Sequence, residues 1–369
     1  MCFIGTATSP HVLRWVKYFV ERKHEVSLIS LDSVNKVPVS GLKVFSIKSH
    51  DFMNPKNIFK IVTLFKTLNK MIAGINPDLI HVHQISSLAY IIPYLRVHPY
   101  ILSAWGSDVL IKPYKSTVHS FLASRAIKKA DLLHCDGIKT FRALENLGAP
   151  PDRIVCVYFG IDIDKFSPEK RDTKYRQALG VDNGLTVIST RALSPIYNVE
   201  TLINAIPRVV REINNAKFLI CGSGSLKEKL EDLAKKLKIS DHTIFTGNIP
   251  VEELPFYVAS SDIYVSTSLS DAGLASSTGE AMACGLPVIV TEDLDNRDWI
   301  KDGVNGFIVP VKNPDALAER IIELARNEKL RGEFGRENRK IITERNDYNT
   351  EMRKMEKEYM RLVSMEASS

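Results

Sequence analysis

Residues 268–292 carry the strongest chemical pattern in the sequence, because an isolated glutamate stands there among small and apolar residues. A glycine-containing loop at Gly273 follows a predicted strand, and a helix is predicted from about Ser276 to Cys284. Free backbone N–H groups at the start of that helix would attract a diphosphate, and Gly273 would let the backbone approach it closely. The Glu280 carboxylate, within the helix, could accept two hydrogen bonds from a sugar diol. The alternative is a structural helix on which Glu280 is solvated or caps a neighbour.

Other positions combine a polar side chain or a glycine with the end of a predicted strand. Arg191 follows the strand predicted at 185–190, and a guanidinium suits phosphate because it is always charged and bidentate. The segment CGSGS at 221–225 follows a strand and precedes a helix, although a G-x-G pair alone is a weak indication. His81 and His83 share one face of a predicted strand, since they lie two residues apart. A surface charge at Arg191 and two core histidines are the structural alternatives.

Alternating strands and helices are predicted to hold these positions. Short apolar runs between helical patterns are typical of a parallel sheet covered on both faces. The alternation restarts after Gly160 and Pro168, so we expect an α/β protein with two Rossmann-like, doubly wound domains facing across a cleft. We place the domains at 1–163 and 164–346, and predict that 347–369 forms a helix packing back on the first domain. Strands are expected at 3–5, 25–31, 78–83, 99–106, 130–135, 153–160, 185–190, 216–222, 242–247, 262–268 and 287–292.

Composition and charge restrict the class of protein. Of 369 residues, 44% are apolar and 25% charged, as in ordinary globular proteins. No stretch approaches the ~20 apolar residues that span a bilayer, and the N-terminus lacks a secretory pattern, so we expect a cytoplasmic protein. The five cysteines include no C-x-x-C pair, which argues against a zinc or redox site. Residues 1–160 hold 20 Lys and Arg against 10 Asp and Glu, and the remainder holds 29 against 33. The first half therefore favours an anionic partner, a membrane surface or lipid phosphate rather than nucleic acid.

The pattern at 268–292 resembles the E-x(7)-E motif of the retaining family-4 glycosyltransferases, which have the GT-B fold. Residues 280–289 reproduce the run E-A-M-A-C-G-L-P-V-I that the second acid opens, which implies that Glu280 holds the nucleotide ribose. The first acid contacts the donor sugar, but Ala272 stands at its position, so the resemblance assigns this role to Asp271. Backbone N–H groups facing the diphosphate would belong to Gly273, Leu274, Ala275 and Ser276.

Further segments of the second half resemble the same family. Residues 188–206 are similar to its G-R-L-x-x-x-K segment, which implies that Arg191 grips the donor diphosphate. Tyr197 replaces the lysine of that segment. The resemblance places backbone contacts to the nucleotide at Gly222, Gly247, Asn248 and Ile249.

The first half resembles the acceptor domain of the family more loosely. Gly5 and Thr6 end the first predicted strand, where the family has a glycine loop over the phosphates. His83 corresponds to the second histidine of an H-x-H segment beside the donor sugar. Trp105 replaces a histidine that many relatives carry before G-x-D.

The resemblance implies a retaining glycosyltransferase that moves a sugar from a UDP- or GDP-linked donor to a hydroxyl acceptor in cell-surface glycan or glycolipid assembly. Catalysis would rest on Arg191, Asp271 and His83, with neither a metal ion nor a cofactor. The expected acceptor is a glycan or a lipid-linked molecule, and nucleic acid is not an expected partner. Two other classes stay open. One is a sugar-nucleotide epimerase on the same scaffold, against which the E-A-M-A-C-G run argues. The other is a binding protein without catalytic activity, which the departures at Ala272, Tyr197 and Trp105 favour.

Residues 56–72 predict a basic amphipathic helix. Its apolar stripe consists of Ile58, Ile61, Val62, Phe65, Leu68 and Ile72. The lysines around it are Lys56, Lys60, Lys66 and Lys70. Such a helix can lie in a lipid interface, so we expect peripheral association with the inner face of the plasma membrane. A core-packed helix with solvated lysines is the alternative.

Overall fold

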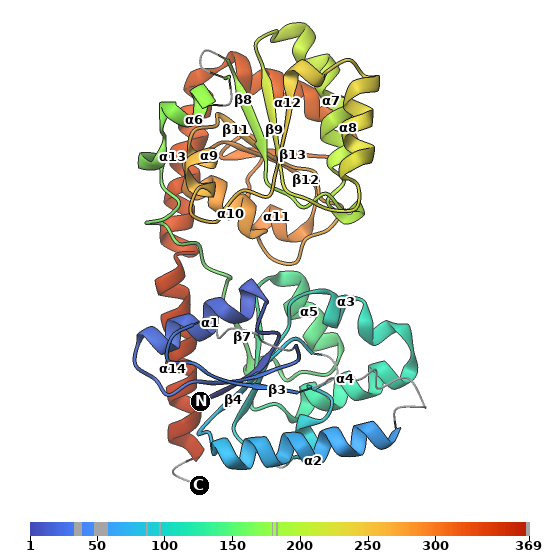
Figure 1. Ribbon diagram of the computed structural model, residues 1–369, viewed down its shortest axis with the longest axis vertical. Coiled ribbons are helices and arrows are strands. Elements are labelled where there is room, and N and C mark those ends of the chain that lie inside the picture. Colours follow the sequence, from blue (N-terminus) through green and yellow to red (C-terminus); the bar gives the residue numbers. More distant parts are fainter. Residues whose placement is uncertain are drawn as a thin grey trace. The chain divides into compact units, whose positions relative to one another are not determined.

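The structure is a computed structural model that describes residues 1–32, 39–47, 58–85, 88–95, 97–178, 180–181 and 184–366. The described residues fall into two compact units, 1–158 with 351–369, and 159–350. Figure 1 shows each unit as a twisted sheet flanked by helices. The chain passes between units at 158/159 and 350/351, a few residues from the positions that the sequence pattern predicts.

A parallel sheet with the strand order β3-β2-β1-β4-β5-β6-β7 forms the centre of the first unit. Most of its strands are fully buried apolar runs, as is typical of parallel sheets between two helix layers. The strands are β1 (Cys2–Gly5), β2 (Ser27–Ser30), β3 (Lys43–Ser46), β4 (Ile80–His83), β5 (Tyr100–Ser103), β6 (Leu132–Cys135) and β7 (Ile154–Cys156). The helices are α1 (Pro10–Glu21), α2 (Ile58–Ile75), α3 (Ser107–Leu110), α4 (Thr117–Lys129), α5 (Ile138–Asn146) and α14 (Tyr348–Glu366), with short 3-10 turns η2 (Ile92–Tyr94), η3 (Lys112–Lys115) and η4 (Pro151–Arg153).

The C-terminal helix α14 is attached to α1 by both apolar and charged side chains. The rings of Phe19 and Tyr359 stack with their centroids 4.9 Å apart. The Glu356 carboxylate lies within 3.1 Å of polar side-chain atoms of Tyr18, Arg22 and His24. Residues 351–369 therefore belong to the first unit although they end the chain. The buried residues of α14 include Met352, Met355, Tyr359 and Leu362.

Helix α2 packs on the core of the first unit through Leu64, Leu68 and Ile72, which are all buried. Val62 on the same helix is 52% exposed. Lys56 lies outside the described residues, and so do the side chains of Ile58, Lys60 and Ile61. The predicted lipid-facing stripe of α2 is thus wrong for Leu68 and Ile72, because they contribute to the core instead.

The second unit is built around a parallel sheet with the order β10-β9-β8-β11-β12-β13. Helix α7 packs against α8 and α12, whereas α10 packs against α9 and α13, and Figure 1 shows these groups on different sides of the sheet. The strands are β8 (Thr186–Ser189), β9 (Lys217–Cys221), β10 (Thr243–Gly247), β11 (Ile263–Ser266), β12 (Val288–Thr291) and β13 (Gly306–Val309). The helices are α6 (Thr173–Ala178), α7 (Val199–Glu212), α8 (Lys227–Lys236), α9 (Leu254–Ala259), α10 (Ser276–Ala283), α11 (Leu294–Trp299), α12 (Pro314–Arg326) and α13 (Glu328–Arg345).

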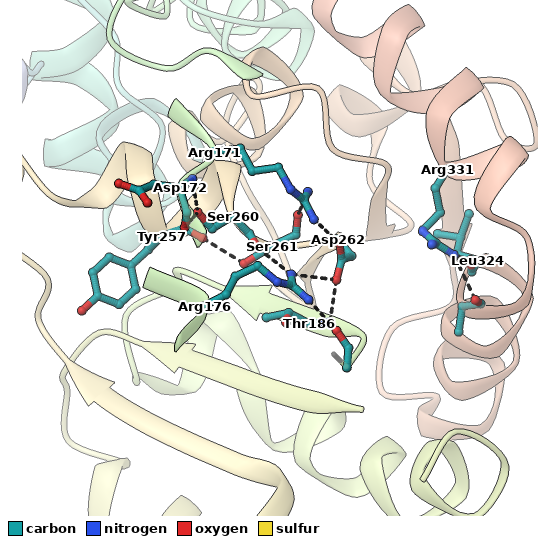
Figure 2. Close-up of polar contacts among 12 residues, drawn as sticks. Arg171, Asp172, Arg176, Thr186, Tyr257, Ser260, Ser261, Asp262, Leu324 and Arg331 are labelled. Carbon is teal, nitrogen blue, oxygen red and sulfur yellow. Dashed lines mark hydrogen bonds and ion pairs between the residues drawn. The ribbon is translucent and has the colours of Figure 1, made fainter. Parts of the chain in front are cut away.

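Asp262 connects Arg171 and Arg176, which precede the first strand of this unit, to the amino edge of its sheet (Figure 2). Its carboxylate accepts hydrogen bonds from Arg171 at 3.0 Å, Arg176 at 3.2 Å and the Thr186 backbone N–H at 2.9 Å. Arg176 also donates to the carbonyl oxygens of Ser260 and Gly184. The network closes the end of the sheet at which β8 and β11 begin.

An open cavity of about 320 Å³ lies beside the Asp262 network. Ligands of open parallel sheets bind at the carboxyl ends of the strands, whereas this cavity borders the amino ends. The chain itself already uses the Arg176 guanidinium, so we assign the cavity a structural place rather than a functional one. Its lining is Arg176, Gly184, Leu185, Ile213, Asn215, Asp262, Ala325 and Arg331.

The predicted α/β class with two doubly wound parallel sheets is confirmed. Each predicted strand overlaps an observed strand, and the helix predicted from Ser276 is α10. Strands β3 and β13 are not among the predicted ones. β3 is short and largely accessible to water, so its sequence lacks a buried apolar run. β13 begins at a glycine and has only four residues.

Candidate functional site

Both sheets reverse their strand order at one point, and predicted site residues follow the strands on either side of it. In the second sheet the reversal lies between β8 and β11, and Arg191 and Asp271 come after those strands. In the first sheet it lies between β1 and β4, which end at Gly5 and His83. Ligands of open parallel sheets bind at such switch points. The fold therefore places these candidate residues at the edge where open parallel sheets generally bind ligands.

Arg191 and Asp271 form an ion pair at the switch point of the second sheet. Their side chains are only 8% and 9% exposed, so water screens the pair poorly. The Arg191 guanidinium carbon also lies 4.3 Å from the centre of the Tyr197 ring. Within the described residues, Nε of Arg191 is buried without a hydrogen-bond partner. The guanidinium is thus fixed in position and retains a buried donor for a further acceptor.

Ser277, in the first turn of α10, connects this pair to the helix. Its Oγ accepts hydrogen bonds from Arg191 at 3.0 Å and from the hydroxyl of Tyr264 at 2.8 Å. Burial raises the pKa of Tyr264, so its hydroxyl stays protonated and remains a donor. Because Ser277 accepts both of these bonds, its own hydroxyl hydrogen is free to point to another acceptor.

Glycines bring the loops after β8, β9 and β10 into direct contact. A Cβ atom at Gly222 would lie 2.8 Å from the Arg191 carbonyl oxygen, and φ at Gly222 is +138°. At Gly224 a Cβ would lie 2.3 Å from the carbonyl oxygen of Leu193. The Gly222 N–H donates to the carbonyl of Gly247 at 2.8 Å. The predicted nucleotide contacts therefore share one edge, which continues with the exposed Asn248 and the half-buried Ile249.

Helix α10 begins without a side-chain cap, since Ala275 holds the capping position. The first amide groups of the helix are thus not satisfied by a capping side chain. The N–H of Gly273 differs from the prediction, because it donates to Asp295 at 2.9 Å and is not a free donor. Glu280 is half-buried within α10, while Leu274 and Ala275 are buried before it.

In the first unit, His83 lies between two rings. Its centroid is 4.4 Å from that of His81 and 5.8 Å from that of Trp105, with interplanar angles of 28° and 14°. The residue is 4% exposed, and neither ring nitrogen has a hydrogen-bond partner within the described part of the chain. Burial, reinforced by nearby histidines, holds the pKa of His83 well below its usual value. A neutral imidazole with an unused donor and an unused acceptor therefore stands at the switch point.

The backbone around His83 is also specialised. A Cβ atom at Gly5 would lie 2.9 Å from Val12 and 3.3 Å from the Cβ of His83, so only glycine fits at the end of β1. The buried carboxylate of Asp108 accepts the N–H groups of Ile85 at 2.8 Å and Trp105 at 3.0 Å. Asp108 thereby holds the two loops that flank the His83 ring. Thr6 follows Gly5 in the turn after β1 and is half-buried.

A chain of hydrogen bonds behind His83 has a fixed direction. The carbonyl of Val157 can only accept, so Nε2 of His134 carries a hydrogen and donates to it at 2.9 Å. Burial lowers the pKa of His134 to about 4, so its Nδ1 is a bare acceptor for the Ser103 hydroxyl at 2.8 Å. Ser103 has given its only hydrogen and must accept from Nε2 of His81 at 2.7 Å.

The last link of this chain reaches α14. Burial also lowers the pKa of His81 well below its usual value, so this ring is neutral. Since its Nε2 carries the hydrogen, its Nδ1 accepts from the hydroxyl of Tyr359. The C-terminal helix thus stabilises, through Tyr359, the tautomer of the ring on which His83 stacks.

Several of these residues have no sequence signal of their own. Ser277, Tyr264 and Asp295 look like ordinary helix and strand residues, and Tyr359 looks like one more apolar position of an amphipathic helix. Only the contacts across the fold assign them to the site. The sequence indicated His81 in part, because its spacing from His83 places both side chains on one face of the strand.

None of the helices among the described residues is long and apolar enough to cross a membrane. The described residues likewise contain no group of three His, Cys, Asp or Glu side chains arranged to hold a metal ion.

Two Rossmann-like units, each with one reversal of its strand order, are the architecture of the GT-B fold. The family of group 1 glycosyl transferases matches residues 171–341, and the family of glycosyl transferase 4-like proteins matches residues 1–137. The chain belongs to this group 1, family-4-like set of glycosyltransferases.

Known relatives agree with this assignment. The chain is 27% identical over 334 residues to the uncharacterized glycosyltransferase MJ1607 of Methanocaldococcus jannaschii, covering 81% of this chain and 80% of that protein. It is 29% identical over 172 residues to a GDP-mannose-dependent alpha-(1-6)-phosphatidylinositol monomannoside mannosyltransferase of Mycolicibacterium smegmatis, covering 45% of each.

Solved structures show the same fold. The crystal structure of Anabaena Alr3699/HepE in complex with UDP has a TM-score of 0.83 at 18% identity, covering 98% of this chain and 99% of that one. The crystal structure of WaaG, a glycosyltransferase involved in lipopolysaccharide biosynthesis, has a TM-score of 0.75 at 15% identity, covering 98% of this chain and 99% of that one. At these identities the likeness shows the fold alone.

Proposed function

We propose that this chain is a retaining glycosyltransferase that moves a sugar from a nucleotide diphosphate sugar to a hydroxyl acceptor in glycan or glycolipid assembly. The observation that carries the proposal is the buried cluster of Arg191, Asp271 and Ser277 at the start of α10. The relatives named above include a protein bound to UDP and one that depends on GDP-mannose. We therefore propose a UDP- or GDP-linked donor.

The cluster supplies what a departing nucleoside diphosphate needs. As the anomeric bond breaks, negative charge grows on the diphosphate, and fixed donors aimed at that charge lower the barrier. Arg191 has a buried Nε–H for this purpose, and Ser277 has a free hydroxyl hydrogen. The uncapped N-terminus of α10 adds its amide groups. This positive environment takes the place of a metal ion in the proposed mechanism.

The remaining roles follow from position and chemistry. The half-buried Glu280 would accept two hydrogen bonds from the ribose diol, and the edge at Gly247 would face the base. Asp271 would hold a sugar hydroxyl and stabilise the positive charge that develops on the ring. His83, a neutral imidazole, would offer its donor and acceptor to sugar hydroxyls.

Retention is proposed because the family that the chain resembles retains the anomeric configuration, and the pairing of Asp271 with a guanidinium argues against Asp271 as an attacking nucleophile. Retaining glycosidases instead place two carboxylates about 5–5.5 Å apart, one of which attacks the sugar. Here the acceptor hydroxyl would attack on the face that the diphosphate leaves. The new bond would therefore form on the side of the old one. The acceptor proton would pass to an oxygen of the departing phosphate.

The test is donor binding and turnover by purified variants. Glu280→Ala should weaken nucleotide binding, and Asp271→Asn should lower kcat more than it raises the donor KM, because the carboxylate matters most as the sugar gains positive charge. Glu319→Gln, an exposed carboxylate on α12, is the control. The anomeric configuration of the product tests retention, and activity in a chelator tests independence of metal ions.

Each alternative class predicts a different outcome. A binding protein would bind nucleotide sugars without turnover across a broad acceptor panel. An epimerase would convert a sugar nucleotide when no acceptor is present. Either result would refute the proposed transfer.

A membrane-bound acceptor is the last part of the proposal. The first unit holds 24 Lys and Arg against 14 Asp and Glu, whereas the second holds 25 against 29. A basic unit is attracted to the anionic lipid of an inner membrane face. We therefore propose a cytoplasmic enzyme that works at that face on a lipid-linked or glycan acceptor.

A further inference from the structure

Residues 111–121 of the first unit expose a group of large apolar side chains in a stretch that the structure describes completely. Ile111 is 57% exposed, Tyr114 62%, Val118 51% and Phe121 63%. Single exposed apolar residues are normal on protein surfaces, whereas a group of them marks an interaction site. We call these four residues the 111–121 surface.

The elements that carry these residues are in contact with one another. The turn η3 packs against both α3 and α4. Helix α4 directs Ala123, Ala126 and Ile127 into the core of the unit. Val118 and Phe121 lie three residues apart, so they share the outward side of the same helix. Val118 and Phe121 are therefore left outside because the core already uses the other side of α4.

The charged residues of the segment that carries the 111–121 surface are all basic. Between residues 109 and 130 the sequence contains five Lys or Arg residues and no Asp or Glu. Arg125 lies over the ring of Tyr94, itself 45% exposed, at 4.8 Å from its centre, which adds another aromatic residue to this region. The five basic residues are Lys112, Lys115, Arg125, Lys128 and Lys129.

This chemistry argues against two other occupants. A second copy bound through the same surface would bring five cations against five cations in a symmetric interface. A soluble glycan needs many side-chain hydrogen bonds beside any aromatic ring on which it stacks, and Ile111, Val118 and Phe121 offer none. An anionic bilayer satisfies both features, since its acyl boundary accepts the apolar tips while its phosphates pair with the lysines.

We propose that the 111–121 surface binds an anionic phospholipid bilayer. Tyr114 and Phe121 enter the headgroup region, where aromatic side chains are favoured. Lys112 and Lys115 lie beside them and pair with lipid phosphates. This proposal deepens the proposed membrane location by naming its surface, and it moves the contact from α2 to η3 and α4.

The experiment is co-sedimentation of the full-length protein with phosphatidylcholine vesicles, with or without phosphatidylglycerol, at low and at physiological salt. Wild-type protein should bind the anionic vesicles and lose affinity as salt rises, because exposed charges are screened. The double variant Tyr114→Ser with Phe121→Ser should bind about tenfold more weakly or worse, since it removes both inserting rings.

Exposed valines on three surfaces supply matched controls. Val118→Ser tests the proposed surface, Val62→Ser tests α2, and Val311→Ser tests the second unit; these valines are 51%, 52% and 42% exposed. Only Val118→Ser should weaken binding. Circular dichroism of each variant confirms that it is folded.

Several results would overturn the proposal. They are wild-type protein that ignores anionic vesicles, a double variant that binds like wild type, and equal losses for all three valine variants. A loss confined to Val62→Ser would assign the contact to α2 instead. A wild-type dimer that the double variant dissolves would assign the surface to a second copy. The assay contains neither donor nor acceptor, so its failure would leave the proposed glycosyl transfer untouched.

Discussion

Replacing Tyr359 by phenylalanine removes one hydroxyl from the buried chain that joins α14 to the first sheet. The ring itself stays, so its stack on Phe19 and its burial change little. What is lost is the donor to Nδ1 of His81. The perturbation therefore isolates a hydrogen bond from the packing around it.

The cost follows from the direction of the chain. His81 cannot recover by moving its hydrogen to Nδ1, because Ser103 would then turn to His81 and leave Nδ1 of His134 without a donor. The Val157 carbonyl fixes the far end, so one buried acceptor stays unpaired in either arrangement. An unpaired buried acceptor costs about 1–3 kcal/mol. In a unit of this size, the melting temperature should fall by about 2–4 °C for each kcal/mol.

The assay combines urea unfolding with nitrogen NMR of the histidine rings. In a Trp299→Phe background, tryptophan fluorescence reports on the first unit, because Trp15, whose ring centroid lies 5.1 Å from that of His81, and Trp105 both belong to it. Wild-type His81 should show only the tautomer with hydrogen on Nε2, and Tyr359→Phe should show a mixture. Tyr18→Phe is the matched control, because its acceptor, the Glu356 carboxylate, keeps Arg22 as a donor. Equal stability of Tyr359→Phe and wild type, or hydrogen on Nδ1 of His81 in wild type, would refute the deduced direction.

Two further predictions concern stability, one for each unit. The free energy of unfolding of the first unit should fall as pH drops from about 6.5 towards 4, by up to about 1.4 kcal/mol per pH unit for each buried histidine. Burial lowers the pKa values of His81, His83 and His134, that of His134 to about 4. In this pH range the unfolded chain therefore binds protons that the folded chain does not bind. A flat pH profile of urea midpoints in this range would contradict it. In the second unit, Asp262→Ala should cost about 3 kcal/mol, because it leaves a buried guanidinium without its carboxylate. Glu319→Ala, at an exposed ion pair, should cost less than about 1 kcal/mol in the same denaturation experiment.

The sequence predicted the strands well where they are buried, because a buried strand appears as a continuous apolar run. Runs such as Leu132–Cys135 and Val288–Thr291 are buried throughout, so their composition alone distinguishes them from helices and loops. It did not predict β3, because that strand is largely accessible and its pairing with β2 depends on the backbone. It assigned all of the α2 stripe to one face, whereas the core takes Leu68 and Ile72 and leaves Val62 outside.

For the candidate site, the sequence alone predicted Arg191, Glu280 and His83, because charged or titratable residues at strand ends and in a small apolar helix are recognisable without a fold. The family resemblance added Asp271. The tertiary structure alone decided their partners. The Arg191–Asp271 pair spans 80 residues, and the Tyr359–His81 bond spans 278. No local pattern encodes contacts at such separations, since they arise when strands distant in sequence become neighbours at a switch point. For the same reason, the free hydrogen of Ser277 and the tautomer of His81 follow only from the hydrogen-bond network of the folded protein. No short segment of the sequence determines them.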